Sequence, residues 1–203
     1  MKNESIAYGI AGVAFGLIAG WIIGTQQPSS RTAAPVAQTT AAPAQSAPSQ
    51  RAAILDEAKV AALKSVAENQ PTNAQPRVEL ANLYFDAERY DDAIAWYQGA
   101  LKLTPNDVNV STDLGVCYYY TNQPDKALLQ LSHSLSIDPK HTKTLLNVGI
   151  VKAFGKQDLE GATAAWQQVV ALGPDTPEGQ AAKRALDTLK SAHGATGGLK
   201  PGG

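Results

Sequence analysis

Apolar and polar residues divide this chain of 203 residues into three stretches of different character. Residues 6–24 are uncharged and mostly apolar, and residues 25–50 are small, polar or proline with few large apolar side chains. From residue 51 onward apolar and charged residues are mixed, and the same residue types return at a fixed interval. The pattern predicts a membrane-spanning helix, a spacer and a folded helical domain, in that order.

The apolar stretch 6–24 is long enough to cross a bilayer. Its 19 residues would form a helix of about 28 Å, close to the hydrocarbon thickness of about 30 Å. A secretory signal peptide has a shorter apolar core and a small-x-small cleavage site, whereas Thr25 to Ser29 offers no such site. We expect an uncleaved transmembrane helix after a short tail of residues 1–5; a cleaved signal peptide and a buried soluble helix are the alternatives.

Basic residues beside this span predict its orientation. Lys2 and the α-amino group precede the span, and Arg31 is the basic residue that follows it. Because basic residues favour the cytoplasmic side, the N-terminus is expected inside and the rest of the chain outside. This predicts a single-span protein of the bacterial inner membrane with a periplasmic soluble domain.

Four glycines, Gly12, Gly16, Gly20 and Gly24, recur at every fourth position of the span. They would form one smooth stripe along the helix, which lets two helix backbones approach closely. The stripe predicts homo-oligomers or docking to another membrane helix. Glycine is also simply frequent in transmembrane helices, so ordinary composition is the alternative.

Residues 25–50 consist almost entirely of Ala, Pro, Ser, Thr and Gln. Such a segment cannot bury a core and is expected to be a disordered linker. As a flexible coil its ends would lie about 28 Å apart. The folded part is therefore expected to be tethered at a distance from the membrane.

Prolines mark a repeat in the remaining sequence. Pro71, Pro105, Pro139 and Pro174 are separated by 34, 34 and 35 residues. The same residue types return between them. The first unit has Leu80, Ala81, Tyr84, Ala93, Tyr97 and Ala100, the second has Leu114, Gly115, Tyr118, Ala127, Leu131 and Ser134, and the third has Val148, Gly149, Ala162 and Trp166.

This pattern resembles the tetratricopeptide repeat, in which small residues stand where two antiparallel helices cross and a proline ends the second helix. The resemblance implies an all-α solenoid with repeats at 74–107, 108–141 and 142–175. Position 4 departs from the family pattern, with Arg77, Ser111 and Leu145 in place of a large aromatic residue. The third repeat also has one extra residue between Gly155 and Gly161, which changes the register of its second helix relative to the first two repeats.

The flanking sequences fit caps of such a solenoid. Residues 51–70 are Ala-rich and match the second helix of an earlier, degenerate repeat. Residues 176–192, with Pro177 near the start and Glu178 in the first turn, predict a C-terminal capping helix. Residues 193–203 are rich in glycine and are expected to fray. Eight helices are expected after the linker.

The resemblance also places the binding surface. In the family, the first helix of each repeat lines a concave groove that binds peptides. The matching positions are Gln75, Val78, Asn82, Phe85 and Asp86 in the first repeat, Asn109, Thr112, Val116, Tyr119 and Tyr120 in the second, and Lys143, Leu146, Ile150, Ala153 and Phe154 in the third. The set is largely apolar, with Phe85, Tyr119, Tyr120 and Phe154 as expected anchors; packing within the domain is the alternative for each.

One family mode of binding is not expected here. Chaperone-binding members hold a C-terminal carboxylate with Lys, Asn, Asn, Lys and Arg. The equivalent residues are Val78, Asn82, Asp113, Lys143 and Asn147. Only Asn82 and Lys143 match, and Asp113 would repel a carboxylate.

Composition excludes several other classes of function. Lys plus Arg number 17 and Asp plus Glu 18, so the basic footprint of a nucleic-acid binder is missing. Cys117 is the one cysteine, and His133, His141 and His193 lie far apart, so no metal site or disulfide framework is expected. No nucleophile, acid–base or phosphate-binding motif is present, so neither an enzyme nor a cofactor is predicted.

The sequence therefore predicts a membrane-anchored protein-interaction module, acting as an assembly factor or scaffold for a peptide or protein partner. A narrower alternative is a chaperone of c-type cytochrome maturation, because the Ala162–Trp166 spacing and the small number of repeats resemble the repeat domain of that machinery. A structural membrane oligomer, associating through the glycine stripe, is the second alternative.

Overall fold

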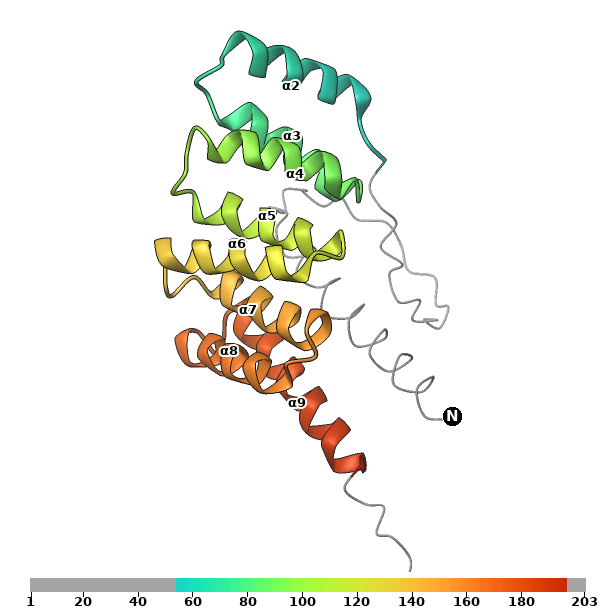
Figure 1. Ribbon diagram of the computed structural model, residues 1–203, viewed down its shortest axis with the longest axis vertical. Helices are drawn as coiled ribbons and strands as arrows, with labels where there is room; N and C mark the ends of the chain where they lie inside the picture. Colours follow the sequence, from blue (N-terminus) through green and yellow to red (C-terminus); the bar gives the residue numbers. More distant parts are fainter. Residues whose placement is uncertain (1–53, 197–203) are drawn as a thin grey trace, which may run out of the picture.

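The computed structural model describes residues 54–196, with side chains described up to residue 191. Eight α-helices and one π-helical turn follow one another in this range, with no strand among the described residues. They are α2 (Glu57–Asn69), α3 (Gln75–Asp86), α4 (Tyr90–Leu101), α5 (Val108–Tyr120), α6 (Pro124–Ile137), α7 (Thr142–Ile150), η1 (Val151–Gly155), α8 (Leu159–Leu172) and α9 (Pro177–Thr196). Figure 1 shows them stacked from α2 at one end to α9 at the other. The predicted all-α solenoid is confirmed.

Three helical hairpins form the body of the stack. We call α3, α5 and α7 the A helices, because each begins a repeat, and α4, α6 and α8 the B helices that follow them. Helix α2 packs on α3 as a B helix without its own partner, and α9 packs on α8 and α7 at the other end. Helix α9 reaches Thr196, beyond the end at residue 192 that the sequence predicts.

Small residues lie where A and B helices cross, as the repeat pattern predicts. Ala81, Ala93 and Ala162 are completely buried. Gly149 lies under the indole of Trp166, which is 1% exposed and whose Nε1 donates a hydrogen bond to the Leu146 carbonyl over 3.1 Å. Since a side chain at position 149 would overlap this ring, the close crossing of α7 and α8 requires glycine.

Two departures from the family pattern have a structural explanation. Arg77 extends to the end of α2, where its guanidinium donates to the carbonyl oxygens of Ala67 and Asn73 over 3.2 and 2.8 Å. It thereby satisfies carbonyl groups that a helix end leaves without partners. Ser111 instead lies in a buried network in which Gln130 and Ser134 donate to its hydroxyl over 2.7 and 2.8 Å. Both positions hold neighbouring helices by hydrogen bonds instead of ring packing.

A left-handed residue ends each A helix. Glu88, Asn122 and Gln157 have φ of 57°, 58° and 56°. In the first repeat the next amide, that of Arg89, donates back to the Tyr84 carbonyl over 2.8 Å. This is the hydrogen bond of a Schellman turn, which closes the helix and reverses the chain toward the B helix.

The extra residue of the third repeat lies inside the corresponding turn. The left-handed residues are separated by 34 and then 35 positions. The third A helix ends in the π-helical turn η1, where the Lys156 amide bonds to the Val151 carbonyl over 3.1 Å. The Asp158 amide then bonds to the Lys152 carbonyl, six residues back instead of five. A π turn absorbs one inserted residue without breaking the helix, so the B helix keeps its place.

None of the helices within residues 54–196 is sufficiently long and apolar to cross a membrane. The predicted tail 1–5, the transmembrane helix 6–24 with Gly12, Gly16, Gly20 and Gly24, and the linker 25–50 lie outside the described residues. They stay predictions from the sequence.

Candidate functional site

We call the surface predicted to bind a partner, formed by positions of α3, α5, α7 and η1, the A-helix face. Asn82, Asn109, Gln75 and Asp86 are exposed there. The apolar and aromatic positions are half-buried, as is Lys143. This half-buried set comprises Val78, Phe85, Val116, Tyr119, Tyr120, Lys143 and Phe154. Half-burial holds a ring in a defined place and still leaves part of it exposed.

Four predicted residues lie inside the domain instead. Thr112 is completely buried, and Leu146, Ile150 and Ala153 are 1%, 4% and 5% exposed. The last three belong to a core that α9 completes. Because they have almost no exposed surface, we leave them out of the binding surface proposed below. Their burial depends on how α9 packs against α7, which repeat positions alone do not indicate.

Thr112 is part of a hydrogen-bond chain between α5 and α7. Its hydroxyl donates to the Val108 carbonyl over 2.7 Å and lies 2.6 Å from the Thr144 hydroxyl. Thr144 lies 2.6 Å from Nδ1 of His141, the residue that precedes α7. Since the Thr112 proton is used by Val108, the geometry favours Thr144 as donor to Thr112 and His141 as donor to Thr144. The chain fixes the second A helix against the third.

An aromatic cluster formed by Phe85, Tyr90, Tyr119 and Tyr120 lies where α3 and α5 end. The Tyr90 and Tyr120 rings are stacked, with centroids 4.6 Å apart and an interplanar angle of 13°. Phe85 contacts both edge-on, at 5.5 and 6.2 Å. Tyr119 lies 5.8 Å from Tyr120. Offset and edge-on arrangements of this kind stabilise aromatic pairs beyond burial alone.

Tyr90 was not among the residues predicted from the sequence. It is the first residue of α4, so family positions counted on A helices miss it. The sequence feature that could have indicated Tyr90 is its position directly after the turn at Glu88. The chain reverses direction in this turn, which brings the start of the B helix beside the end of the A helix. Phe154 extends the series, since Phe85, Tyr119 and Phe154 each stand three residues before a left-handed residue.

An ion pair joins the middle of the A-helix face. Lys143 Nζ lies 2.6 Å from Asp113 Oδ1, with side-chain exposures of 16% and 22%. Burial raises the pKa of Asp113, and the Lys143 ammonium opposes that rise. Lys143 is therefore already engaged by a carboxylate of the same face. This supports the expectation that the face does not hold a C-terminal carboxylate in the chaperone-binding manner.

Polar groups of α3 lie beside this pair. The Tyr97 hydroxyl donates to Asn82 Oδ1 over 2.6 Å. Burial, and then the charge of Asp113, raise the pKa of Asp86, while Lys59 lowers it. Cys117, completely buried, lies among these groups, and burial raises the pKa of its thiol. A buried thiol held in its neutral form acts as a small apolar residue.

Across positions 54–196 no three His, Cys, Asp or Glu side chains are grouped so as to hold a metal ion. Every buried side-chain nitrogen and oxygen in that range has a hydrogen-bond partner. His133 is exposed on α6, apart from His141. What the A-helix face presents is rings, amides and a few charges.

Residues 73–140 match the family model described as tetratricopeptide repeat. Among curated proteins, Hsp70-Hsp90 organizing protein 3 of Arabidopsis thaliana is 29% identical over 87 residues, or 43% of this chain and 16% of that protein. BBSome complex member BBS4 of Bos taurus is 32% identical over 108 residues, or 53% of this chain and 20% of that protein. The chain spans a fifth or less of the length of either relative.

Solved structures show the same fold. The Sgt2 repeat domain from Aspergillus fumigatus has a TM-score of 0.56 at 23% identity, covering 64% of this chain and 85% of that one. MamA has a TM-score of 0.55 at 14% identity, covering 69% and 90%. The first repeat domain of Spaghetti (RPAP3), bound to an HSP90 peptide, has a TM-score of 0.54 at 24% identity, covering 60% and 93%.

Proposed function

We propose that the A-helix face binds an extended or helical peptide segment of a protein partner. The aromatic cluster is the observation that carries this proposal. Its rings are half-buried and fixed by mutual packing where α3 and α5 end and α4 begins, so a partner side chain would meet preorganised apolar surface. Neighbouring amides, among them Asn82 and Asn109, would bond the partner's backbone.

Two structural relatives support a peptide as the ligand class. The RPAP3 domain is bound to the HSP90 peptide SRMEEVD. The Yersinia enterocolitica secretion chaperone SycD is in complex with a peptide of the translocator YopD, at a TM-score of 0.53 and 20% identity. A micromolar complex requires about −8 kcal/mol, which a few buried aromatic contacts with hydrogen bonds can supply.

The test is site-specific photocrosslinking in cells that contain the full chain. A photoreactive phenylalanine analogue replaces Tyr120 on the A-helix face or, as control, Leu129, which is 74% exposed on the B helix α6. Capture of a discrete partner from position 120, weakened by Phe85→Ser, is expected. Equal capture from both positions would contradict binding at this face.

We further propose that residues 6–24 anchor this module in a bacterial inner membrane, with the domain on the periplasmic side and residues 25–50 as its tether. The uncharged span and the placement of Lys2 and Arg31 support this arrangement. Tethering would raise the local concentration of a captured chain beside the membrane. The protein would then act as an assembly factor or scaffold for a membrane-associated complex.

A narrower form of the proposal is a chaperone of c-type cytochrome maturation. The resemblance of the Ala162–Trp166 segment to that machinery supports it; in this chain both residues are buried packing residues. C-terminal peptides of an apocytochrome, titrated into the full chain, provide the test. Absence of binding at high micromolar peptide would remove this form and leave the general proposal in place.

A further inference from the structure

We infer that the partner segment brings a cationic side chain, Lys or Arg, next to a large apolar side chain at the aromatic cluster. The inference rests on the proposed function, because it specifies the ligand of the same face. Two carboxylates beside the cluster, those of Asp86 and Glu88, carry it together with the rings. Neither makes a side-chain hydrogen bond or ion pair within residues 54–196.

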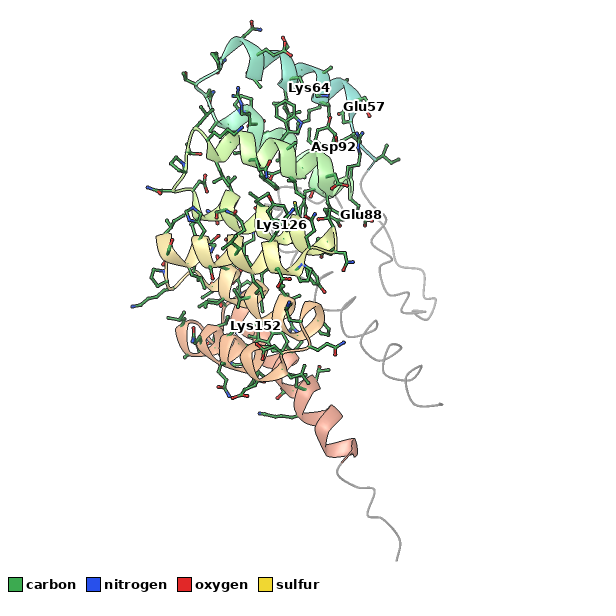
Figure 2. All side chains as sticks on the ribbon, viewed as in Figure 1. Glu57, Lys64, Glu88, Asp92, Lys126 and Lys152 are labelled. Atoms are coloured by element: carbon green, nitrogen blue, oxygen red, sulfur yellow. The ribbon has the colours of Figure 1, made fainter. Side chains whose placement is uncertain are left out.

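Glu88 lies beside the stacked rings. It occupies the left-handed position at the end of α3, two residues before Tyr90. Burial raises the pKa of Tyr120 to about 12, and the charge of Glu88 adds to that rise. The fold therefore holds Glu88 next to the cluster. Figure 2 shows it at the edge of the stack where α4 begins.

Asp86 is the last residue of α3 and directly follows Phe85 of the cluster. Burial raises the pKa of Asp86, the charge of Asp113 adds to that rise and the charge of Lys59 opposes it, but no ion pair joins Asp86 to Lys59 among the described residues. Asp113 is already bound to Lys143. The nearby cations are Lys143, which is bound to Asp113, Arg89, which is bound to Asp92 over 2.8 Å, and Lys59, which forms no ion pair with Asp86. The carboxylates of Asp86 and Glu88 have no ion-pair partner among the described residues.

This arrangement suits a basic side chain for two reasons. A cation over the faces of aromatic rings is attracted by their quadrupoles, and a carboxylate forms charge-assisted hydrogen bonds with an ammonium or guanidinium group. An acidic segment would instead meet Asp86, Glu88 and Asp113 together. Charge complementarity therefore selects a basic and apolar segment over an acidic one.

Three labelled dodecapeptides test the inference by fluorescence polarisation with the full chain in a nonionic detergent. In each, Leu alternates with a second residue, which is Lys, Gln or Glu. We expect the Lys peptide to bind at least tenfold more tightly than the Glu peptide. The double substitution Asp86→Asn and Glu88→Gln should weaken the Lys peptide about fivefold and leave the Gln peptide unchanged.

Two controls separate a local effect from net charge. Asp175→Asn removes an exposed carboxylate in the turn before α9 and should change nothing. Raising the salt from 50 to 500 mM should weaken the Lys peptide more than the Gln peptide, because exposed charges are screened.

The outcomes distinguish this inference from the proposed function. Equal binding of the Lys and Gln peptides, or no effect of the double substitution, overturns the cationic ligand; crosslinking from Tyr120 would still support peptide binding. No binding of any peptide, with no crosslinked partner, overturns both. Stronger binding of the Glu peptide overturns the inference alone.

Discussion

At the scale of single residues, glycines that look alike in the sequence have different surroundings. Gly149 lies under the rigid indole of Trp166, and a methyl group there would overlap the ring. Gly99, inside α4, has only the Arg77 side chain near the corresponding position, with Cδ at 3.6 Å. Space, more than backbone conformation, decides which of the two can be replaced, because neither has a positive φ.

Gly149→Ala is expected to lower the free energy of unfolding by about 1–3 kcal/mol, since overfilling a packed core displaces its neighbours. Gly99→Ala is the matched control and should raise it by about 0.5–1 kcal/mol, because alanine favours the helix. Urea unfolding followed by circular dichroism measures both. A Gly149→Ala protein as stable as the parent would show that Trp166 moves aside without cost.

His141 makes the stability of the α5–α7 contact depend on pH. Burial lowers the pKa of His141, and the charges that face it are Asp138, Lys143, Asp113 and Glu178. A lowered pKa means that the unfolded chain binds the proton more tightly. The contribution of neutral His141 to the free energy of unfolding is therefore complete above the ordinary pKa of histidine, and it decreases as the pH falls below that value.

The free energy of unfolding should decrease between pH 7.5 and 5.5, with a slope of less than about 1.4 kcal/mol per pH unit, the limit for one proton. His141→Asn should flatten this slope, whereas His133→Asn, at an exposed position of α6, should leave it unchanged. Urea titrations at four pH values compare the slopes. An unchanged slope in His141→Asn would assign the pH dependence to other groups.

At the scale of elements, α9 has one face buried in the core and one face exposed to solvent. Ala181, Ala182 and Ala185 are at most 2% exposed and complete the core of the third repeat. Lys183 and Arg184 stand 35 residues after Val148 and Gly149, at the positions that pack against a B helix inside a repeat. In α9 both are exposed. Its outer face is thus polar where a further B helix would need apolar contact, as expected of a capping helix.

Ala182→Glu should destabilise the domain by about 2–4 kcal/mol, because it places an unpaired carboxylate in the core. Lys183→Glu changes the neighbouring, exposed residue and should alter stability by less than about 0.5 kcal/mol. Thermal unfolding of the two proteins gives the comparison. Similar midpoints would mean that α9 is not firmly docked on α7 and α8.

At the scale of the whole molecule, the described residues bury three apolar clusters, which the half-buried Tyr118 and Tyr119 connect, and the two ends of the stack differ. At one end α9 presents a polar outer face. At the other, α2 is a B helix without an A helix before it among the described residues, and the chain there leads back to the predicted linker and anchor. The proposed tether thus joins the α2 end of the solenoid.

The anchor predicts a further result. The full chain should remain with the membrane fraction after alkaline washing, and Gly16→Ile with Gly20→Ile should abolish self-association in a membrane dimerisation assay if the glycine stripe packs helices. Ala11→Ile with Ala19→Ile, off the stripe, is the control. Release by alkaline washing would contradict the membrane anchor. Unchanged self-association of the protein with Gly16→Ile and Gly20→Ile would mean that the glycines reflect only the ordinary composition of transmembrane helices.

The sequence predicted the fold because its signals are local and periodic. Prolines, small residues and rings at intervals of 34 indicate hairpins that can bury their apolar sides only by stacking. It predicted Phe85, Tyr119 and Tyr120 on one face for the same reason. It missed Tyr90, which reaches the cluster through the turn at Glu88, and it included Leu146 and Ile150, which lie in the core.

What the sequence by itself determined is the number of helices, their hairpin pairing and the positions of close crossing, since each depends on residues within one repeat. Only the tertiary structure decided which residues remain at the surface, where a partner could contact them. The burial of Leu146 depends on α9, the ion pair of Lys143 depends on Asp113, and the extra residue is absorbed in η1. The first two contacts join a repeat to its cap or one repeat to the next, and the third depends on how one helix ends, so spacing along the chain does not determine them.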